Sequence, residues 1–534
     1  MMSVTVSSLL SHCAKGTALP HLLSLCHVQR GMASQCCCLG LRPSKAWLRG
    51  PSSHRDCALG PGVGPRAPRH SSSAGEDPDY QLTPAQVDGI LQANEQSVRV
   101  PELEGRGQSA VLRFESNQLA ANTPNEDRRS SATCLQTRGM MFGVFDGHCG
   151  HACAQTVSER LLYYAAVALM PQRSLEEIED AVESRRPVPP LLQWYKHHND
   201  YNYRESSPLY AEHLRLFWQE LLAGEEHLEG MSPQDALDRA FRRLDADISL
   251  EAQAPLESDP LRSAALQTAF AGSTACVAFV DGEGVHVANA GDCRAVLGAQ
   301  AGDGSWSAVP LSRDHNATNG VEVERVRSRH PEAEQDTVVA DERLLGILMP
   351  LRAFGDVRFK WSRELQRSVL EDARDLEDLA VYQYTPPNYL TPPYLEAAPE
   401  LTYHRLRPGD RFLILASDGL WDMLESQEAV QLVAEHLTGL RQQGALFARE
   451  WQVGAGRARG QPLECPAPAA PHLDANSATH LIRHAIGLNE YGEVDQERLA
   501  AMLSLPEDTA RMYRDDITVT VIYFNSNTMK EQEN

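Results

Sequence analysis

The stretch Met140–Gly150 reads M-M-F-G-V-F-D-G-H-C-G and joins an apolar run to a polar turn. The run over 140–145 predicts a buried strand, and apolar residues at helical spacing from Val157 to Ala165 predict a helix that follows the turn. Between them stands Asp-Gly-His at 146–148. A strand end holds a side chain in a fixed direction, which suits a metal ligand. Asp-Gly is also a common turn, so a structural and a functional interpretation both stay open at this point.

Bulk composition narrows the class of protein. The chain has 534 residues, 42% of them apolar, and a formal net charge of −23. That apolar content allows a sizeable core. The negative charge argues against nucleic acid as the main partner, because phosphate backbones bind Lys and Arg. It is compatible with a soluble enzyme that binds cations.

The first 70 residues differ from the rest. They hold eight Lys or Arg and a single acid, Asp56, so the segment carries +7 and the remainder −30. A basic, Ser-rich and acid-poor start is typical of a mitochondrial transit peptide, and a disordered leader is the alternative. Six of the twelve cysteines lie here and the others are scattered, which favours a reducing compartment. The chain has no apolar run long enough for a transmembrane segment.

Residues 71–534 are predicted to form one domain with insertions near 171–232, 299–350 and 441–474. Residues 300–409 mix turns, acids and prolines, and we expect a partly extended surface segment there. Strands are predicted at 110–114, 131–136, 140–145, 274–280, 285–289, 294–297, 411–416 and 517–524. One helix is predicted to begin at Pro84, and further helices are predicted over 150–170, 236–248, 426–440 and 478–486. Hairpin-connected strands with interspersed helices indicate an α+β fold of antiparallel sheets faced by helices.

Carboxylates recur at the ends of these predicted elements. Asp418 ends an apolar strand, Asp292 lies in a turn between two strands, and Asp515 directly precedes the last strand. Glu126 and Asp127 stand in a polar loop between strands. Converging aspartates cannot all stay ionised without cations, and hard carboxylate oxygens suit Mg²⁺ or Mn²⁺.

Seven motifs then occur in a recognisable order: E-D-R-R, V-F-D-G-H-C-G, G-S-T-A, N-A-G-D-C-R-A, R-A-F-G-D, S-D-G-L-W-D and R-D-D-I-T. This set, from Glu126 to Thr518, resembles that of the metal-dependent, type-2C protein serine/threonine phosphatases. F-E-S-N-Q-L-A-A-N and A-R-M-Y-R-D-D-I-T look more narrowly like the pyruvate dehydrogenase phosphatase branch. G-H-A-C-A-Q, G-D-C-R-A and V-T-V-I-Y-F-N-S look more like the second catalytic isoform of that branch than like its first. The resemblance implies two antiparallel β-sheets packed as a sandwich, flanked by helices, with a metal centre at one edge.

The resemblance also implies roles for the motif residues. Asp146 would bridge two Mg²⁺ or Mn²⁺ ions, and the carbonyl of Gly147 would hold one of them. Asp418 and Asp515 would hold the other ion. Asp127 would act through bound water. The implied chemistry is attack on phosphoserine by a water that the two metals activate, without a covalent intermediate.

Other positions are implied less directly. Asp292, with Asp418, matches a third and weaker metal site, and Glu126 is a further candidate for contact through water. His148 matches a general acid, with a turn or a hydrogen bond to a metal-binding aspartate as its alternative. Many relatives carry a phosphate-binding Arg where this chain has Asn122, so Asn122 is a weak candidate for the substrate phosphate. Asp356 matches a family motif near the site and is not predicted to be a ligand.

Partners and location follow from the same resemblance. It implies phosphorylated pyruvate dehydrogenase E1 alpha as substrate, docking on the lipoyl domain of the acetyltransferase core, a regulatory subunit, and a mitochondrial matrix location. Alternatives are another phosphoprotein, such as branched-chain 2-oxo acid dehydrogenase, or a non-catalytic binding relative. A cysteine-dependent phosphatase is disfavoured, because C-x₅-R spacing occurs only at Cys36–Arg42 in the leader. No twelve-residue calcium loop is present.

Overall fold

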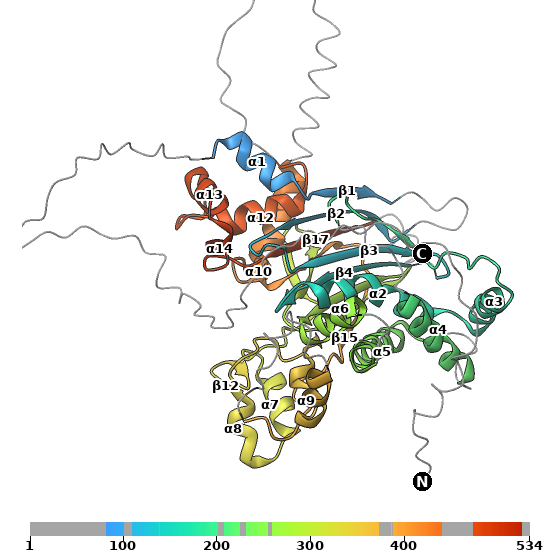
Figure 1. Cartoon of the computed structure of the whole chain (residues 1–534). Coiled ribbons are helices and arrows are strands. Elements are labelled where there is room, and N and C mark those ends of the chain that lie inside the picture. The colour runs from blue at the N-terminus through green and yellow to red at the C-terminus, as the bar shows by residue number, and fades with distance from the viewer. Residues whose placement is uncertain are drawn as a thin grey trace, which may run out of the picture. The chain divides into compact units, whose positions relative to one another are not determined.

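The computed structural model describes residues 82–100, 109–137, 139–200, 208–224, 231–254, 259–372, 386, 388–439 and 474–525 (Figure 1). The predicted leader over 1–70 and residues 441–473 of the third predicted insertion lie outside this described part. Two six-stranded sheets form the framework, and every pairing within them is antiparallel.

The first sheet has the order β1-β2-β17-β16-β10-β11. Its strands are β1 Gln96–Arg99, β2 Val111–Leu119, β17 Ile517–Phe524, β16 Asp410–Ala416, β10 Arg294–Gln300 and β11 Trp306–Pro310. The central strand β17 is buried along its whole length, because both faces of the sheet are covered. This explains why its sequence is continuously β-branched and aromatic instead of alternating.

The second sheet has the order β15-β9-β8-β4-β3-β6. Its strands are β15 Glu400–Arg405, β9 Gly284–Ala290, β8 Ala275–Val280, β4 Gly139–Phe145, β3 Arg128–Cys134 and β6 Leu192–Trp194. The strand of the opening motif, β4, lies inside this sheet between β8 and β3, and all seven of its residues are buried. Asp146 therefore follows one of the most rigidly held strands of the fold.

The two sheets face each other across an apolar layer. Phe142 of β4, Leu297 of β10, Leu415 of β16 and Ile522 of β17 belong to one cluster of fully buried side chains between them. The predicted sandwich is thereby confirmed.

Helices cover the two outer faces, as Figure 1 shows. Against the first sheet pack α1 Pro84–Gln92, α10 Asp418–Trp421, a helix over 426–439, α12 Ser477–Gly487 and α13 Gln496–Leu503. On the second sheet lie α2 Ala152–Leu169 and α5 Pro233–Gln253. Further out, α4 Pro208–Ala223 packs on α2, α3 Gln172–Glu183 packs on α4, and α6 Asp259–Phe270 packs on α2 and α5. Within the described part of the chain, no helix combines the length and the apolar character that a membrane crossing needs.

The central strands were predicted within a few residues, except that β2 extends five residues further, to Leu119. The four strands at the sheet edges were missed: β1, β11, β15 and β6. In β1, β11 and β15 every residue is at least partly exposed, and polar residues interrupt the apolar ones, so these strands give no continuous apolar run. The edge strands therefore lack the continuous apolar run from which the central strands were predicted.

The expectation of a partly extended segment over 300–409 was wrong for its middle part. This region forms α7 Gly320–Ser328, α8 Gln335–Val338 and α9 Arg363–Asp372, with the short strands β12 Val339–Ala340, β13 Arg343–Leu344 and β14 Phe354–Gly355. Val326, Leu351, Phe359 and Tyr394 belong to a local apolar cluster. Its members are far apart in sequence, so no periodic stripe revealed them.

The core between the sheets predicts a specific cost of mutation. Phe142→Ala removes a fully buried ring, and we expect the free energy of unfolding to fall by about 3–5 kcal/mol. Leu112→Ala is the matched control, because Leu112 lies on β2 but is 51% exposed, and it should cost less than about 0.5 kcal/mol. Urea unfolding measures both. Equal losses in the two variants would contradict this placement of the core.

Candidate active site

Three carboxylates from separate elements meet at one edge of the sandwich. Asp146 follows β4, Asp292 lies between β9 and β10, and Asp418 begins α10 directly after β16. Each offers a carboxylate oxygen within 4.8 Å of those of the other two. Both sheets thus bring a carboxylate to the same point, and the metal-binding roles predicted for Asp146 and Asp418 stay predictions.

Asp127 and Asp515 surround this trio. The negative charges of both act on Asp146. Asp127 is buried, and its Oδ2 accepts a hydrogen bond of 2.7 Å from Ser417 Oγ. Its Oδ1 is also buried and has no hydrogen-bond partner among the described residues. A buried carboxylate oxygen without a donor is costly unless something else, such as a cation, satisfies it.

Burial and the nearby negative charges raise the pKa values of these carboxyl groups. Burial and the charge of Asp418 raise the pKa of Asp146 well above its usual value. Burial and the charge of Asp516 raise the pKa of Asp127 to about 8, and burial with the charge of Asp314 raises the pKa of Asp292 to about 7. These carboxyl groups cannot all be ionised at once unless a cation offsets their charge. Several carboxylate oxygens at one point suit hard divalent cations such as Mg²⁺ or Mn²⁺.

Gly147 has a steric reason to be glycine. A Cβ at this position would stand 2.4 Å from the backbone carbonyl oxygen of Glu126. Only glycine therefore lets the loop that carries Asp127 lie against the end of β4. The Glu126 side chain spans the same turn from the other side, since its Oε1 accepts a hydrogen bond of 2.7 Å from Gly150 N. Burial raises the pKa of Glu126 to about 7.

Asp516 fixes this loop instead of facing the trio. It accepts hydrogen bonds from the backbone N–H groups of Ala121, Asn122 (2.9 Å) and Glu126 (2.8 Å). The side-chain amide of Asn122 donates to it as well, at 2.9 Å. The two neighbouring aspartates thus differ in role. The charge of Asp515 acts on the trio, whereas Asp516 holds the loop through hydrogen bonds. The sequence prediction that Asn122 contacts substrate phosphate stays a prediction.

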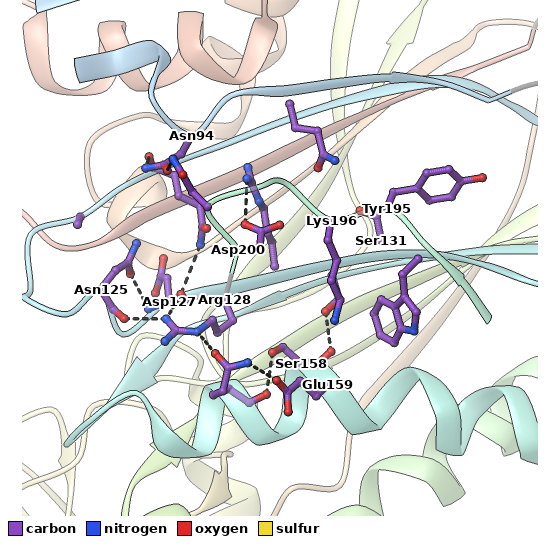
Figure 2. Close-up of a pocket in the computed structure, with 18 residues that line it drawn as sticks. Asn94, Asn125, Asp127, Arg128, Ser131, Ser158, Glu159, Tyr195, Lys196 and Asp200 are labelled. Atoms are coloured by element: carbon purple, nitrogen blue, oxygen red, sulfur yellow. Dashed lines mark hydrogen bonds and ion pairs between the residues drawn. The ribbon is translucent and has the colours of Figure 1, made fainter. Parts of the chain in front are cut away.

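Arg128 supports the same loop from behind. Its Nη1 donates to the carbonyl oxygens of Asn125 and Asp127, both at 2.7 Å, and its Nε donates to Gln155 of α2. Figure 2 shows these contacts at one end of a cavity of about 150 Å³. The guanidinium therefore ties the Asp127 loop to the helix that follows the opening motif.

His148 is held by a contact that crosses the chain. Its Nε2 lies 2.5 Å from Oδ2 of Asp356, a fully buried residue 208 positions away. The two meet above Gly272, where a Cβ would stand 2.0 Å from the imidazole and 2.2 Å from the carboxylate. Burial lowers the pKa of His148, but the charge and hydrogen bond of Asp356 outweigh it and leave the pKa above its ordinary value.

A small three-stranded sheet creates this meeting. In it β7 Gly272–Ser273 pairs with β5 Gly147–His148 on one side and with β14 Phe354–Gly355 on the other. The sequence had singled out R-A-F-G-D without a role for Asp356. It also gave no role to Ser417 or Gly272. The only available signal was that each stands inside a recognised motif, because two-residue strands leave no periodic pattern.

Comparisons with known proteins give the same class. Residues 195–450 match the family model described as "Protein phosphatase 2C". The chain belongs to this family, and it is a metal-dependent protein phosphatase, a hydrolase, as the site geometry and the motif order indicated.

The relatives are more specific. The chain is 56% identical over 465 residues to "[Pyruvate dehydrogenase [acetyl-transferring]]-phosphatase 2, mitochondrial" of Homo sapiens, covering 87% of both chains. It is 56% identical over 460 residues to the phosphatase 1 of Bos taurus, covering 85% of both. A protein phosphatase 2C homolog of Schizosaccharomyces pombe is 30% identical over 459 residues, 84% of this chain and 88% of that one. The first two are named mitochondrial, which supports a mitochondrial location here.

Mutual repulsion in the cluster predicts an unusual stability effect. In the presence of a chelator, Asp146→Asn should raise the midpoint of thermal unfolding, because the substitution removes one of several crowded negative charges. The expected gain in the free energy of unfolding is about 1 kcal/mol. Mn²⁺ should stabilise the natural protein and leave the variant almost unchanged.

Asp410→Asn is the control for this measurement, since Asp410 accepts from His404 Nε2 at 2.8 Å far from the trio. It should lower the unfolding midpoint and keep the Mn²⁺ response. Scanning calorimetry with and without Mn²⁺ distinguishes the cases. A lower midpoint for Asp146→Asn in chelator would contradict the crowding argument.

The hydrogen bonds from Arg128 to the Asp127 loop and to Gln155 predict that Arg128 affects metal affinity. Arg128→Lys loses the fork that reaches two carbonyl oxygens and Gln155, so Mn²⁺ should bind about 10- to 100-fold more weakly. Arg129→Lys is the matched control, because Arg129 contacts Ser116 and Asp200 instead of the loop. Calorimetric titration of the chelator-treated proteins measures both affinities. Equal Mn²⁺ affinity in Arg128→Lys and the natural protein would remove this role.

Proposed function

We propose that this chain is the phosphatase that removes phosphate from serine on the E1 alpha subunit of pyruvate dehydrogenase, and so reactivates that enzyme. The observation that carries the proposal is 56% identity over 87% of both chains to the pyruvate dehydrogenase phosphatase 2 of Homo sapiens. The full set of predicted carboxylates, Asp127, Asp146, Asp292, Asp418 and Asp515, supports catalysis over a purely binding role.

Two Mg²⁺ or Mn²⁺ ions are proposed for the site, held through Asp146, the Gly147 carbonyl, Asp418 and Asp515, with Asp127 acting through water. A third, weaker ion is proposed at Asp292. When bound, such ions lower the pKa of water and offset the charge of a phosphoryl group.

The protein's own contribution to the chemistry centres on His148. The leaving serine oxygen needs a proton, and an imidazole whose pKa is raised by Asp356 carries that proton at neutral pH to a greater extent than a free histidine. The His148 side chain keeps 21% of its surface exposed, whereas Asp356 keeps none. The imidazole can thus reach substrate while its partner stays fixed beneath it.

The matrix of the mitochondrion is the proposed location, and the lipoyl domain of the acetyltransferase core and a regulatory subunit are proposed partners. Segments within 171–232, 299–350 and 441–474 are proposed to contribute to this docking. The first of these carries the edge strand β6 of the second sheet and the helices α3 and α4, which pack on each other.

A direct assay tests the proposed substrate. Purified protein should release phosphate from phosphorylated pyruvate dehydrogenase in the presence of Mg²⁺ or Mn²⁺, with a higher kcat/KM than for phosphorylated branched-chain 2-oxo acid dehydrogenase or a generic phosphopeptide. Chelation should abolish release from all three. A preference for the branched-chain enzyme would reassign the substrate.

The role of His148 predicts a selective loss. His148→Ala should lower kcat by about 10²- to 10⁴-fold with little change in KM, because only the proton donor is lost. His404→Ala is the matched control, since His404 also holds an aspartate through Nε2 but lies on β15, away from the trio. Steady-state kinetics measures both. An unaltered kcat in His148→Ala would return this residue to a structural role.

A further inference from the structure

The carboxylate cluster poses a problem for substrate binding. A phosphoserine carries about two negative charges at neutral pH and must approach a site built from aspartates. Asn122, the residue that the sequence assigned to this phosphate, brings no charge, and its side-chain amide already donates to Asp516. A cationic group elsewhere at the site would serve the phosphate better.

Two cations recur among the charges that act on these carboxyl groups. His148 acts on Asp292 and Glu126, and Arg511 acts on Asp515 and Glu126. His148 is committed to Asp356. Arg511 forms an ion pair through Nη1 with Oδ2 of Asp515, and 49% of its side chain is exposed. It is thus both at the cluster and accessible from solution.

Local structure explains how Arg511 comes to lie there. The short helix α14 Glu507–Ala510 ends at Arg511, and a turn over 511–513 then leads to Asp515 and β17. The i,i+4 spacing from Arg511 to Asp515 is therefore fixed by the entry into a central strand. The charges of Asp418 and Asp146 reach Arg511 too and, against the effect of burial, help to raise the pKa of its guanidinium.

The pair differs from an ordinary surface ion pair. Arg173 and Glu177 have the same i,i+4 spacing, but their side chains are 88% and 67% exposed and no metal ligand is involved. Asp515 is 21% exposed and is a predicted metal ligand. A guanidinium has five N–H donors, so a pair through Nη1 leaves donors that can bind two phosphate oxygens in a planar fork.

We propose that Arg511 binds the phosphate of the phosphoserine substrate, which is the role that the sequence suggested for Asn122. The assignment rests on the proposed function and deepens it, because it names the cation that offsets the substrate charge beside the carboxylates. It also explains how a chain with Asn122 at this position retains a phosphate-binding cation.

The test uses the full chain and inorganic phosphate as the probe. Inhibition by phosphate is measured with p-nitrophenyl phosphate as substrate at saturating Mg²⁺, and Mn²⁺ affinity is measured separately by calorimetric titration without substrate. The variants are Arg511→Gln, Arg511→Lys and Asn122→Ala, with Arg173→Gln as the control for loss of one i,i+4 arginine.

Arg511→Gln should weaken phosphate inhibition and raise KM by about 10- to 100-fold, the usual effect of losing a charge-assisted hydrogen-bond pair. Arg511→Lys should recover part of this loss, because it restores charge without the fork. Mn²⁺ should bind Arg511→Gln as tightly as the natural protein or more tightly. Arg173→Gln should match the natural protein throughout.

Two results would overturn the proposal. Unchanged phosphate inhibition with weaker Mn²⁺ binding in Arg511→Gln would mean that Arg511 only positions Asp515. A larger loss in Asn122→Ala than in Arg511→Gln would return the phosphate to Asn122. Because the probe and the small substrate are generic, failure to act on pyruvate dehydrogenase would overturn the proposed substrate and leave this result interpretable.

Discussion

The crowding of carboxylates at one edge of the sandwich is the constraint on which the rest of the site depends. Asp146, Asp292 and Asp418 arrive from three different elements of two sheets and meet within 4.8 Å. Burial and mutual repulsion make that arrangement unfavourable in a protein without cations. The apolar layer between fully buried strands must therefore hold the acids together, and divalent cations bound there would offset their charge.

Each neighbouring group serves this arrangement in a distinct way. Asp516 fixes the loop before β3 through backbone N–H groups, and Arg128 ties the same loop to α2. Gly272 leaves the space in which His148 meets Asp356. The functional groups therefore sit on the ends of rigid elements, and residues behind them set their direction, which is how a site keeps its geometry without a ligand.

The sequence predicted the central strands, the sandwich and the convergence of Asp146 with Asp418, because buried strands give continuous apolar runs that stop at a carboxylate. It missed the edge strands such as β1 and β15, whose side chains are at least partly exposed and mix polar with apolar residues. It also missed the contact between His148 and Asp356, since two-residue strands and 208 intervening positions leave no local pattern. The neighbours of Asn122 could be identified only in three dimensions, because they depend on how the turn before β17 packs against the loop.

Anomalous diffraction from crystals grown with Mn²⁺ tests whether the converging carboxylates form a cation site. We expect manganese peaks in contact with Asp146 and Asp418, with Asp515 or Asp292 beside them. Crystals at saturating Mn²⁺ that show no peak at these carboxylates, or peaks only elsewhere on the protein, would contradict it.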